Sequence, residues 1–308
     1  MLTVENLSVT FSMYNDGLRQ QQLVVITDLD LEINAGEVVA VLGSSGSGKS
    51  LLAHAVLGIL PNNASVGGTM MFAGEPLTTQ RQAQLRGKQI ALIPQSVGYL
   101  DPLMPVGQQV ARAAQLSGVP QPQQAVRQTF NRYSLADRVR NMLPFQLSGG
   151  MARRILVSTA AIGQAQLIIA DEPTPGLHPD VVAETLRHLR ELADSGKAVM
   201  LITHDIQAAL AVADRVAVFY AGTTVEVARA TDFAGDGQAL RHPYTQALWR
   251  ALPQNDFTPL PGVQPAPNAL PSGCLFLDRC PLKTSMCEVE RPALRSLRGG
   301  AVRCIHAT

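Results

Sequence analysis

The chain reads Gly43-Ser44-Ser45-Gly46-Ser47-Gly48-Lys49-Ser50 between an apolar, strand-like run at 38–42 and a helix-compatible run at 51–57. The segment matches G-x-x-x-x-G-K-[ST], in which glycines let backbone N–H groups turn toward a polyphosphate at a helix N-terminus. Lys49 would reach the β- and γ-phosphates, and the Ser50 hydroxyl would hold Mg²⁺. An ordinary Gly/Ser turn is the alternative. With the strand before it, the segment predicts a nucleoside triphosphate site.

Composition limits the number of domains and the kinds of partner that the chain can have. The 308 residues, 46% of them hydrophobic, are enough for a large core and a second small domain. The formal net charge of +1 does not suggest nucleic acid as a main partner. The N-terminus lacks the pattern of a secretory signal, and the longest uncharged apolar run, 155–170, is shorter than the roughly 20 residues that span a bilayer. We therefore expect a soluble chain that reaches a membrane only through a partner.

The hydrophobic pattern changes along the chain. Residues 1–42 are β-rich, and Asn34-Ala-Gly36 is typical of a hairpin turn. From about 105 to 165 the pattern is helical, which predicts a helical insertion. The apolar runs at 167–171 and 198–202 are typical of buried parallel strands, and helical segments alternate with them. The sequence therefore predicts an α/β fold with a parallel sheet.

Two carboxylates, Asp171 and Glu172, end the buried run that begins at Leu167. Carboxylates in such a place must face a cleft or be paired. Asp171 suits Mg²⁺ binding, either directly or through water, and Glu172 suits polarisation of an attacking water. An acidic pair that merely starts a helix is the alternative interpretation.

A second glycine motif is Leu147-Ser148-Gly149-Gly150-Met151, which alone would indicate a helix N-terminus capped by Ser148. Together with the glycine loop, the Asp171-Glu172 pair and Thr203-His204-Asp205, it resembles the signature of ATP-binding cassette (ABC) ATPases. Order and spacing match throughout residues 1–225. The resemblance implies a P-loop NTPase cassette with a RecA-like core, an antiparallel β subdomain and the helical insertion.

The resemblance also implies roles for single residues. Two such subunits stack head to tail, so that Ser148, Gly149 and Gly150 would serve the partner's nucleotide. Gln95 would sense Mg²⁺ and the γ-phosphate, and His204 would contact the γ-phosphate as the switch histidine. Phe11 is the candidate to stack on adenine, although a core Phe in an alternating strand is a comparable interpretation. The catalytic candidates are Glu172, His204 and Gln95; the candidates for Mg²⁺ are Ser50, Gln95 and Asp171; those for ATP are Phe11, Gly43, Ser44, Ser45, Gly46, Ser47, Gly48, Lys49, Ser50, Ser148, Gly149 and Gly150.

Two positions depart from the family pattern. The signature ends in Met151 where the family usually has Gln, and residue 178 is His where the family usually has Asp at the dimer interface. Either change would weaken one of the two composite ATP sites. We expect this chain to keep its own hydrolytic residues and its partner's site to be the less competent one.

Segments beyond the cassette narrow the resemblance to oligopeptide, dipeptide and nickel importer ATPases. They are Phe219–Glu226, Arg241-His-Pro-Tyr-Thr-Gln-Ala-Leu248 and Gly273–Pro281. The family implies a second ABC ATPase subunit (a heterodimer is expected), two membrane permease subunits and an extracytoplasmic substrate-binding protein. It places the chain at the cytoplasmic face of the membrane. Tyr99–Met104 would receive a coupling helix of the permease, unless this segment is only a buried loop.

All the cysteines, Cys274, Cys280, Cys287 and Cys304, fall in the last 35 residues. In the family that it resembles, four tail cysteines ligate a 4Fe–4S cluster. From the residues alone, the spacings of five, six and sixteen intervening residues fit zinc knuckles less well. The Cys280-Pro281 pair is similar to the end of some ferredoxin ligand runs. An iron–sulfur cluster is favoured over zinc, and free or paired thiols stay open.

The predicted organisation is a nucleotide-binding domain at 1–230 and a C-terminal extension at 231–308. Six of the 20 prolines lie at 253–271 and indicate a stiff linker to a small separate cysteine module at 272–308. The leading functional hypothesis is an ATPase that energises import of peptides or nickel and other metal chelates. A soluble ABC ATPase without transport and a metal- or redox-sensing ATPase are the alternatives.

Overall fold

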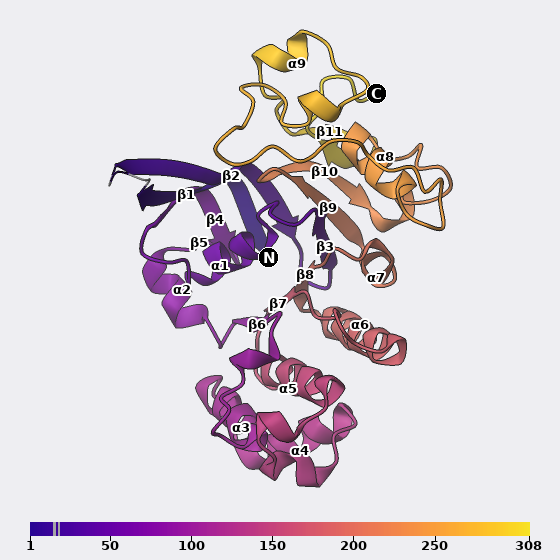
Figure 1. The fold of residues 1–308 in the computed structure, drawn as a ribbon. Coiled ribbons are helices and arrows are strands. Elements are labelled where there is room, and N and C mark those ends of the chain that lie inside the picture. The colour runs from indigo at the N-terminus through magenta and orange to yellow at the C-terminus, as the bar shows by residue number, and fades with distance from the viewer. Residues whose placement is uncertain (15–16, 18) are drawn as a thin grey trace.

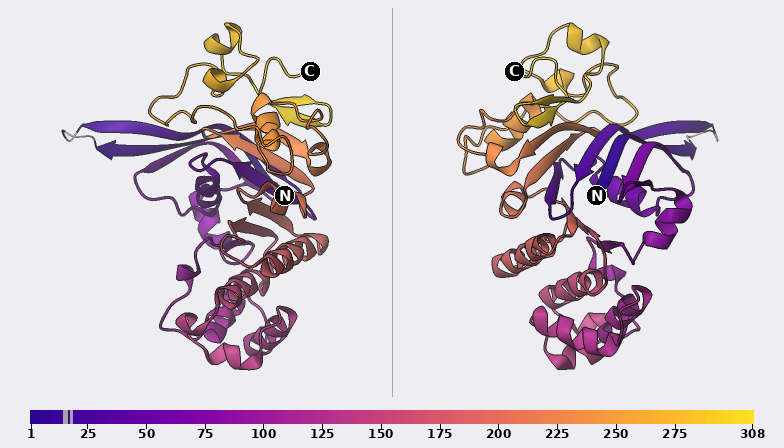
Figure 2. Two further views of the ribbon diagram at one scale, coloured as in Figure 1. Left: turned by 45° about the vertical axis from the view of Figure 1, so that its right-hand side comes forward. Right: turned by 180° about the vertical axis from the view of Figure 1, so that it is seen from behind.

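The protein is described by a computed structural model that covers residues 1–14, 17 and 19–308. It is built on two β-sheets with helices packed around them, as Figure 1 shows. The α3, α4 and α5 helices gather at one end of the molecule, and the C-terminal region lies at the opposite end. Figure 2 confirms this arrangement from two further sides. The two sheets therefore lie between a helical end and a C-terminal end.

The larger sheet has the strand order β11-β12-β10-β9-β3-β8-β7-β6. Its central strands β9, β3, β8, β7 and β6 are parallel, and every residue of β3, β7 and β8 is buried. Continuous apolar strands covered on both faces are what a parallel α/β sheet requires. The predicted α/β fold is confirmed. The bounds are β3 Val38–Gly43, β6 Ile90–Ile93, β7 Leu167–Asp171, β8 Ala198–Ile202, β9 Arg215–Tyr220, β10 Thr223–Arg229, β11 Arg295–Leu297 and β12 Gly300–Val302.

The smaller sheet is antiparallel and has the order β2-β1-β4-β5. The segment Asn34–Gly36 turns the chain, but the prediction of a hairpin is wrong. The strand before it, β2, pairs with β1, whereas the strand after it, β3, joins the parallel sheet. A local turn signal does not reveal which sheet the next strand joins. The bounds are β1 Leu2–Tyr14, β2 Gln20–Ile33, β4 Ala64–Phe72 and β5 Glu75–Pro76.

The helices follow the apolar spacing of the sequence. In α3, Val106, Val110 and Ala114 recur every four residues and are buried. In α5, a Ser148 N-cap precedes two glycines, and its hydroxyl accepts a hydrogen bond from the Met151 N–H. The bounds are α1 Lys49–Leu57, α2 Thr79–Leu85, α3 Val106–Leu116, α4 Pro122–Arg132, α5 Gly149–Ala161, α6 Pro179–Asp194, α7 Ile206–Leu210, α8 Pro243–Arg250 and α9 Met286–Val289.

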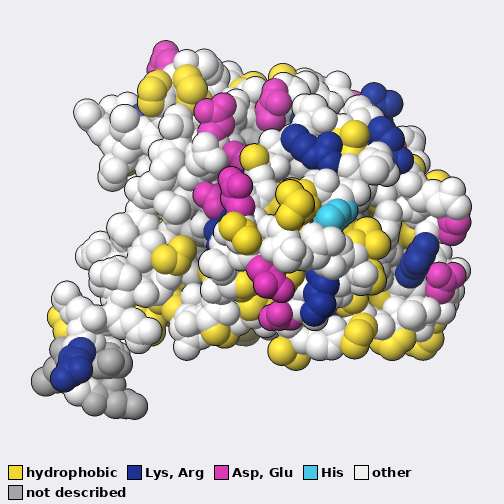
Figure 3. Space-filling view, turned by 90° about the horizontal axis from the view of Figure 1, so that it is seen from above, with side chains coloured by type: hydrophobic (Ala, Val, Ile, Leu, Met, Phe, Trp, Pro, Cys, Tyr) yellow, Lys and Arg dark blue, Asp and Glu magenta, His cyan; other side chains and the backbone are white. Residues whose placement is uncertain are grey.

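The C-terminal region differs from the predicted separate module. Its strand β12 pairs with β10, so the hairpin β11–β12 extends the main sheet. Leu275 and Phe276 belong to the same buried cluster as Ala40 and Leu42 of β3. Proline content indicates a stiff segment but does not reveal that the segment packs against the domain. Seen from above, this end carries apolar side chains scattered among acidic and basic ones (Figure 3).

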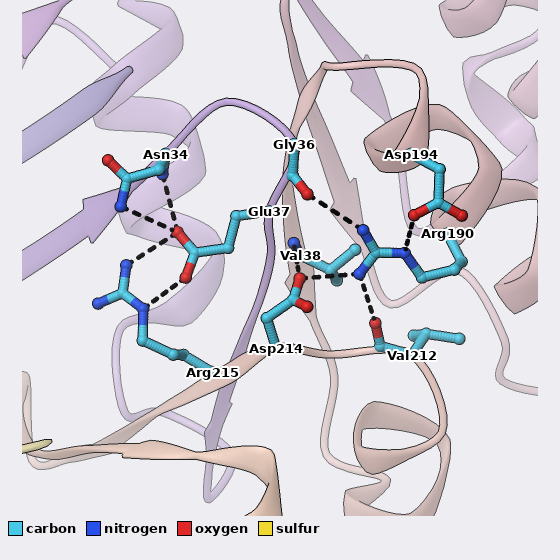
Figure 4. A network of polar contacts seen from close by, with 9 residues as sticks. All are labelled: Asn34, Gly36, Glu37, Val38, Arg190, Asp194, Val212, Asp214 and Arg215. Carbon is cyan, nitrogen blue, oxygen red and sulfur yellow. Dashed lines mark hydrogen bonds and ion pairs between the residues drawn. The ribbon is translucent and has the colours of Figure 1, made fainter. Parts of the chain in front are cut away.

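A network of charged residues fixes the N-terminal ends of the central strands (Figure 4). Arg190 of α6 donates to the Asp214 carboxylate at 2.8 Å, and the same carboxylate oxygen accepts from the Val38 N–H at 2.8 Å. Arg215 of β9 binds the Glu37 carboxylate. Burial raises the pKa of Glu37, but its hydrogen bonds, chiefly to Arg215, outweigh burial and lower that pKa overall. The network ties α6, β3 and β9 together at the edge opposite the glycine loop.

We expect Arg190→Ala to lower the free energy of unfolding by about 1–2 kcal/mol, because it removes hydrogen bonds to two backbone carbonyls and two carboxylates from a side chain that is only 26% exposed. Urea denaturation measures this change. The matched control is Arg187→Ala on the same helix, whose ion pair with Glu191 is exposed and should contribute less than about 1 kcal/mol. Equal losses in the two variants would contradict the structural role of the network.

Candidate functional site

A cavity of about 660 Å³ opens at the carboxyl ends of the parallel strands, where ligands bind in open α/β sheets. The glycine loop after β3 forms its floor. Gln95, Glu172 and His204 follow β6, β7 and β8 respectively, and all three line the cavity. Residues predicted from separate motifs thus meet at one site. Its lining consists of Val25, Ser45, Gly46, Ser47, Gly48, Lys49, Ser50, Leu51, Gln95, Glu172, Pro175 and His204.

Two glycines of the loop are required by close packing. A Cβ at Gly43 would lie 2.5 Å from the Phe219 carbonyl oxygen and 2.6 Å from the Ser47 hydroxyl. Gly48 is the N-cap of α1 with a φ of 95°, and a Cβ there would lie 3.0 Å from Ile26. The loop therefore packs against the end of β9 and against β2. This packing leaves the N-terminus of α1 facing the cavity.

The ammonium group of Lys49 is folded back onto the start of the loop. It donates to the carbonyl oxygens of Gly43 at 2.8 Å and Ser44 at 3.0 Å. Burial lowers the pKa of Lys49, and the carboxylates of Glu172 and Asp171 partly oppose that shift. The cation therefore lies in the lining of the cavity, where an arriving polyphosphate would contact it.

Asp171 and Ser50 form a second polar pair. The Ser50 hydroxyl donates to Asp171 Oδ1 at 3.1 Å. Burial raises the pKa of Asp171, and the neighbouring Glu172 carboxylate adds to that effect, while the Ser50 hydrogen bond opposes it. A divalent cation would reverse this balance, since its charge favours the ionised carboxylate. Hydroxyl and carboxylate oxygens are also the ligands that Mg²⁺ prefers.

Glu172 and His204 face each other. The His204 Nδ1 lies 3.0 Å from both carboxylate oxygens of Glu172. Glu172 has a φ of 46°, a left-handed conformation that is unusual for a residue other than glycine. The side chain of Glu172 is 10% exposed, whereas that of His204 is 66% exposed. A buried carboxylate held in a strained backbone at the mouth of a cavity is a common arrangement for a catalytic base.

The other predicted nucleotide contacts lie elsewhere. Ser148 and Gly149 are exposed at the start of α5 and, among the described residues, are not part of the cavity lining. Phe11 packs at the margin of the β-subdomain core. Among the described residues it is not part of the cavity lining, which includes Val25 of β2. His178 is exposed at the N-cap of α6, with its Nδ1 3.5 Å from the Asp180 carboxylate. The roles predicted for these residues stay predictions.

Sequence reasoning missed Arg153. It lies in α5 and is 4% exposed. Its guanidinium donates to the carbonyl oxygens of Pro94 at 2.7 Å and Gln95 at 2.8 Å. The helix that begins with the glycine signature is thereby bonded to the main chain of Gln95. A charged residue on the apolar face of a helix was the only signal available in the sequence.

The four cysteines converge although three of them lie on irregular segments. They line one small cavity together with His242 and His306. In the part of the chain that the structure describes, none of the four is joined in a disulfide. Burial, reinforced by the other three cysteine sulfurs, raises the pKa of Cys274 to about 11. Cys287 Sγ lies 3.4 Å from His306 Nε2, a neighbour that the cysteine spacing did not predict. Among the described residues, no group of three His, Cys, Asp or Glu is arranged to hold a single metal ion.

Comparison with known proteins identifies the relatives of this chain. A family model described as "ABC transporter" matches residues 26–175, and one described as "Oligopeptide/dipeptide transporter, C-terminal region" matches residues 225–287. The oligopeptide transport ATP-binding protein OppD of Escherichia coli is 33% identical over 98% of this chain and 92% of its own length. The dipeptide transport ATP-binding protein DppD of the same organism is 34% identical over 97% and 94%.

Solved structures agree on the fold. The ATP-binding cassette MJ0796, in a dimeric post-hydrolysis state with ADP and Pi, superposes with a TM-score of 0.66 at 23% identity over 75% of this chain and 99% of that chain. In residues 1–14, 17 and 19–308, no helix combines the length and apolar character needed to cross a bilayer. On the strength of the full-length relatives and both family models, the chain belongs to the ATP-hydrolysing, ATP-binding proteins of ABC transporters, in the oligopeptide/dipeptide group.

Proposed function

We propose that this chain hydrolyses ATP to energise the import of oligopeptides or dipeptides. The observation that carries the proposal is the cavity in which Gln95, Glu172 and His204 surround the glycine loop. The peptide cargo comes from the relatives, which are named for oligopeptide and dipeptide transport. The comparisons give no support to nickel, to a non-transport ATPase or to a metal- or redox-sensing ATPase.

Each residue at the cavity has its own proposed role in ATP hydrolysis. Lys49 and the backbone N–H groups of the glycine loop bind the phosphates, and Ser50 with Asp171 holds Mg²⁺. Glu172 accepts a proton from the attacking water, because its carboxylate is held at the cavity mouth. His204 positions that carboxylate and contacts the γ-phosphate. Gln95 completes the Mg²⁺ and γ-phosphate contacts from the end of β6.

Exposed residues at the start of α5 and after Gln95 are the proposed contacts with the other subunits of the transporter. Ser148, Gly149 and Gly150 would bind the nucleotide of a second, non-identical ABC ATPase subunit. Tyr99 and Leu103, which follow the Gln95 loop, are 63% and 88% exposed and would receive a helix of one of two permease subunits. An extracytoplasmic binding protein would select the peptide. The chain would then lie at the cytoplasmic face of the membrane, held there by the permeases.

For the cysteine cavity we propose a 4Fe–4S cluster rather than a single zinc ion. The proposal rests on the convergence of all four cysteines on one cavity, since four cysteine thiolates are the usual ligands of such clusters. Cys274, Cys280, Cys287 and Cys304 would hold the cluster, and a bound cluster would cross-link the loops of the C-terminal region. The role proposed for the cluster is therefore stabilisation of the C-terminal region.

We expect Glu172→Gln to reduce the ATPase turnover of the assembled transporter by about a hundredfold, because it removes the proton acceptor for water. MgATP binding should persist, since the phosphate contacts come from the glycine loop. A coupled phosphate-release assay on the complex in liposomes measures turnover. The matched control is Glu75→Gln, a carboxylate paired with Arg81 outside the cavity, which should leave turnover unchanged.

Unchanged turnover in Glu172→Gln would reject Glu172 as the dominant base.

The same liposomes test which cargo the transporter imports. Labelled di- and oligopeptides should accumulate with ATP in the wild-type complex and fail to accumulate in the variant. ATP-dependent uptake of nickel with no uptake of peptides would overturn the proposed cargo while leaving the ATPase assignment intact.

We expect the full-length chain purified without oxygen to show visible charge-transfer absorption and about four irons per chain. Cys287→Ser should lose the iron and lower the melting temperature, because the loops are no longer cross-linked. Ser296→Ala, an exposed residue of β11 that does not line the cysteine cavity, is the control and should keep both. A colourless protein that contains zinc would contradict the cluster.

A further inference from the structure

The proline-rich segment at 253–271 lies against the glycine loop. Gln264 Oε1 accepts a hydrogen bond from the Ser44 hydroxyl at 2.7 Å and another from the Ala221 N–H at 3.1 Å. Because the Ala221 N–H can only donate, the oxygen of the Gln264 side chain must face these two groups. One side chain of the C-terminal region thus joins the start of the loop to the turn between β9 and β10.

Both partners of Gln264 are part of the support of the loop. Ser44 provides one of the two carbonyl oxygens that hold the Lys49 ammonium, at 3.0 Å. Ala221, with a φ of 48°, occupies the turn after β9, whose last residues pack against Gly43. A shift of Ser44 would therefore move one of the two ligands of Lys49. Gln264 itself is not among the described residues that line the cavity, so any effect on the ATP site would pass through Ser44.

The segment is also held on its other side. Arg279 Nε donates to the Pro261 carbonyl at 2.9 Å, and its Nη2 donates to the Leu260 carbonyl at 3.3 Å. The same guanidinium contacts the Tyr220 hydroxyl at 3.3 Å. Arg279 directly precedes Cys280 in the chain. The segment is therefore fixed between the cysteine loops and the glycine loop, and cannot act as a free spacer.

We propose that Gln264 is a positioning residue of the ATP site, so that ATP binding and the docking of segment 253–271 stabilise each other. The inference rests on the assignment of the glycine loop to ATP and adds a residue that no family motif described above includes. Linkage requires the effect to be reciprocal. If docking favours the ATP-binding form of the loop, bound ATP must favour docking by the same factor.

The first test is MgATP affinity of the full-length chain, measured by titration with a fluorescent ATP analogue. Gln264→Met keeps the length of the side chain and removes the acceptor. It should weaken binding by about threefold to tenfold, the range for one or two lost hydrogen bonds. Gln254→Met is the matched control, because Gln254 is an exposed residue of the same segment.

A double-mutant cycle with Ser44→Ala separates positioning from a general loss of stability. If Gln264 acts through Ser44, Gln264→Met should cost much less affinity in the Ser44→Ala background than in the wild type. Full additivity of the two losses would overturn the proposal. Lys49→Ala should abolish binding whatever Gln264 does. Retained binding in that variant would count against the ATP assignment itself.

The reciprocal effect, that of bound ATP on docking of the segment, is measured by amide hydrogen exchange of the peptides that cover residues 258–266. Saturating MgATP should slow their exchange in the wild-type chain and have a clearly smaller effect in Gln264→Met. A variant that melts at a lower temperature but keeps wild-type ATP affinity and the wild-type exchange response would overturn the proposal. That outcome would leave Gln264 with a purely structural role.

Discussion

The buried ammonium group of Lys49 sets the arrangement of the whole pocket. Its side chain is taken out of water, which is costly unless the charge is compensated. Two backbone carbonyls provide hydrogen bonds, and the carboxylates of Asp171 and Glu172 provide a favourable field. These groups come from the ends of different parallel strands, so the sheet must be intact for the charges to balance. The cation is thereby ready for a polyphosphate before one arrives.

The C-terminal region takes part in this arrangement because a buried arginine joins it to the strands above the pocket. Arg303, next to Cys304, donates to the Asp30 carboxylate at 2.7 Å and to the carbonyls of Asp28 at 2.8 Å and Thr224 at 3.1 Å. Asp28 and Asp30 belong to β2, the strand that also carries Val25 into the cavity lining. Displacement of the C-terminal region would break these three contacts and leave the Asp30 carboxylate without its guanidinium partner, so the contacts hold the region against the domain.

The sequence predicted those site residues that lie in a motif directly after a strand. Gln95, Glu172 and His204 each follow a buried strand by one or two residues, and parallel strands bring such positions to one edge. Gln264 and Arg153 were missed because their contacts span 220 and 58 residues with no motif at either end. Spacing and composition describe neighbours along the chain. They do not record which distant carbonyl or hydroxyl a buried polar side chain will reach.

The bonds of Arg153 tie the helix that begins with the glycine signature to the main chain at Gln95. The exposed N-terminus of α5 carries the signature that would serve the partner's nucleotide, while Arg153 on the same helix holds the carbonyls of Pro94 and Gln95. Because this guanidinium is buried, the bonds cannot be exchanged for water at little cost. A movement of α5 would therefore also displace the main chain at Gln95, which lines the cavity.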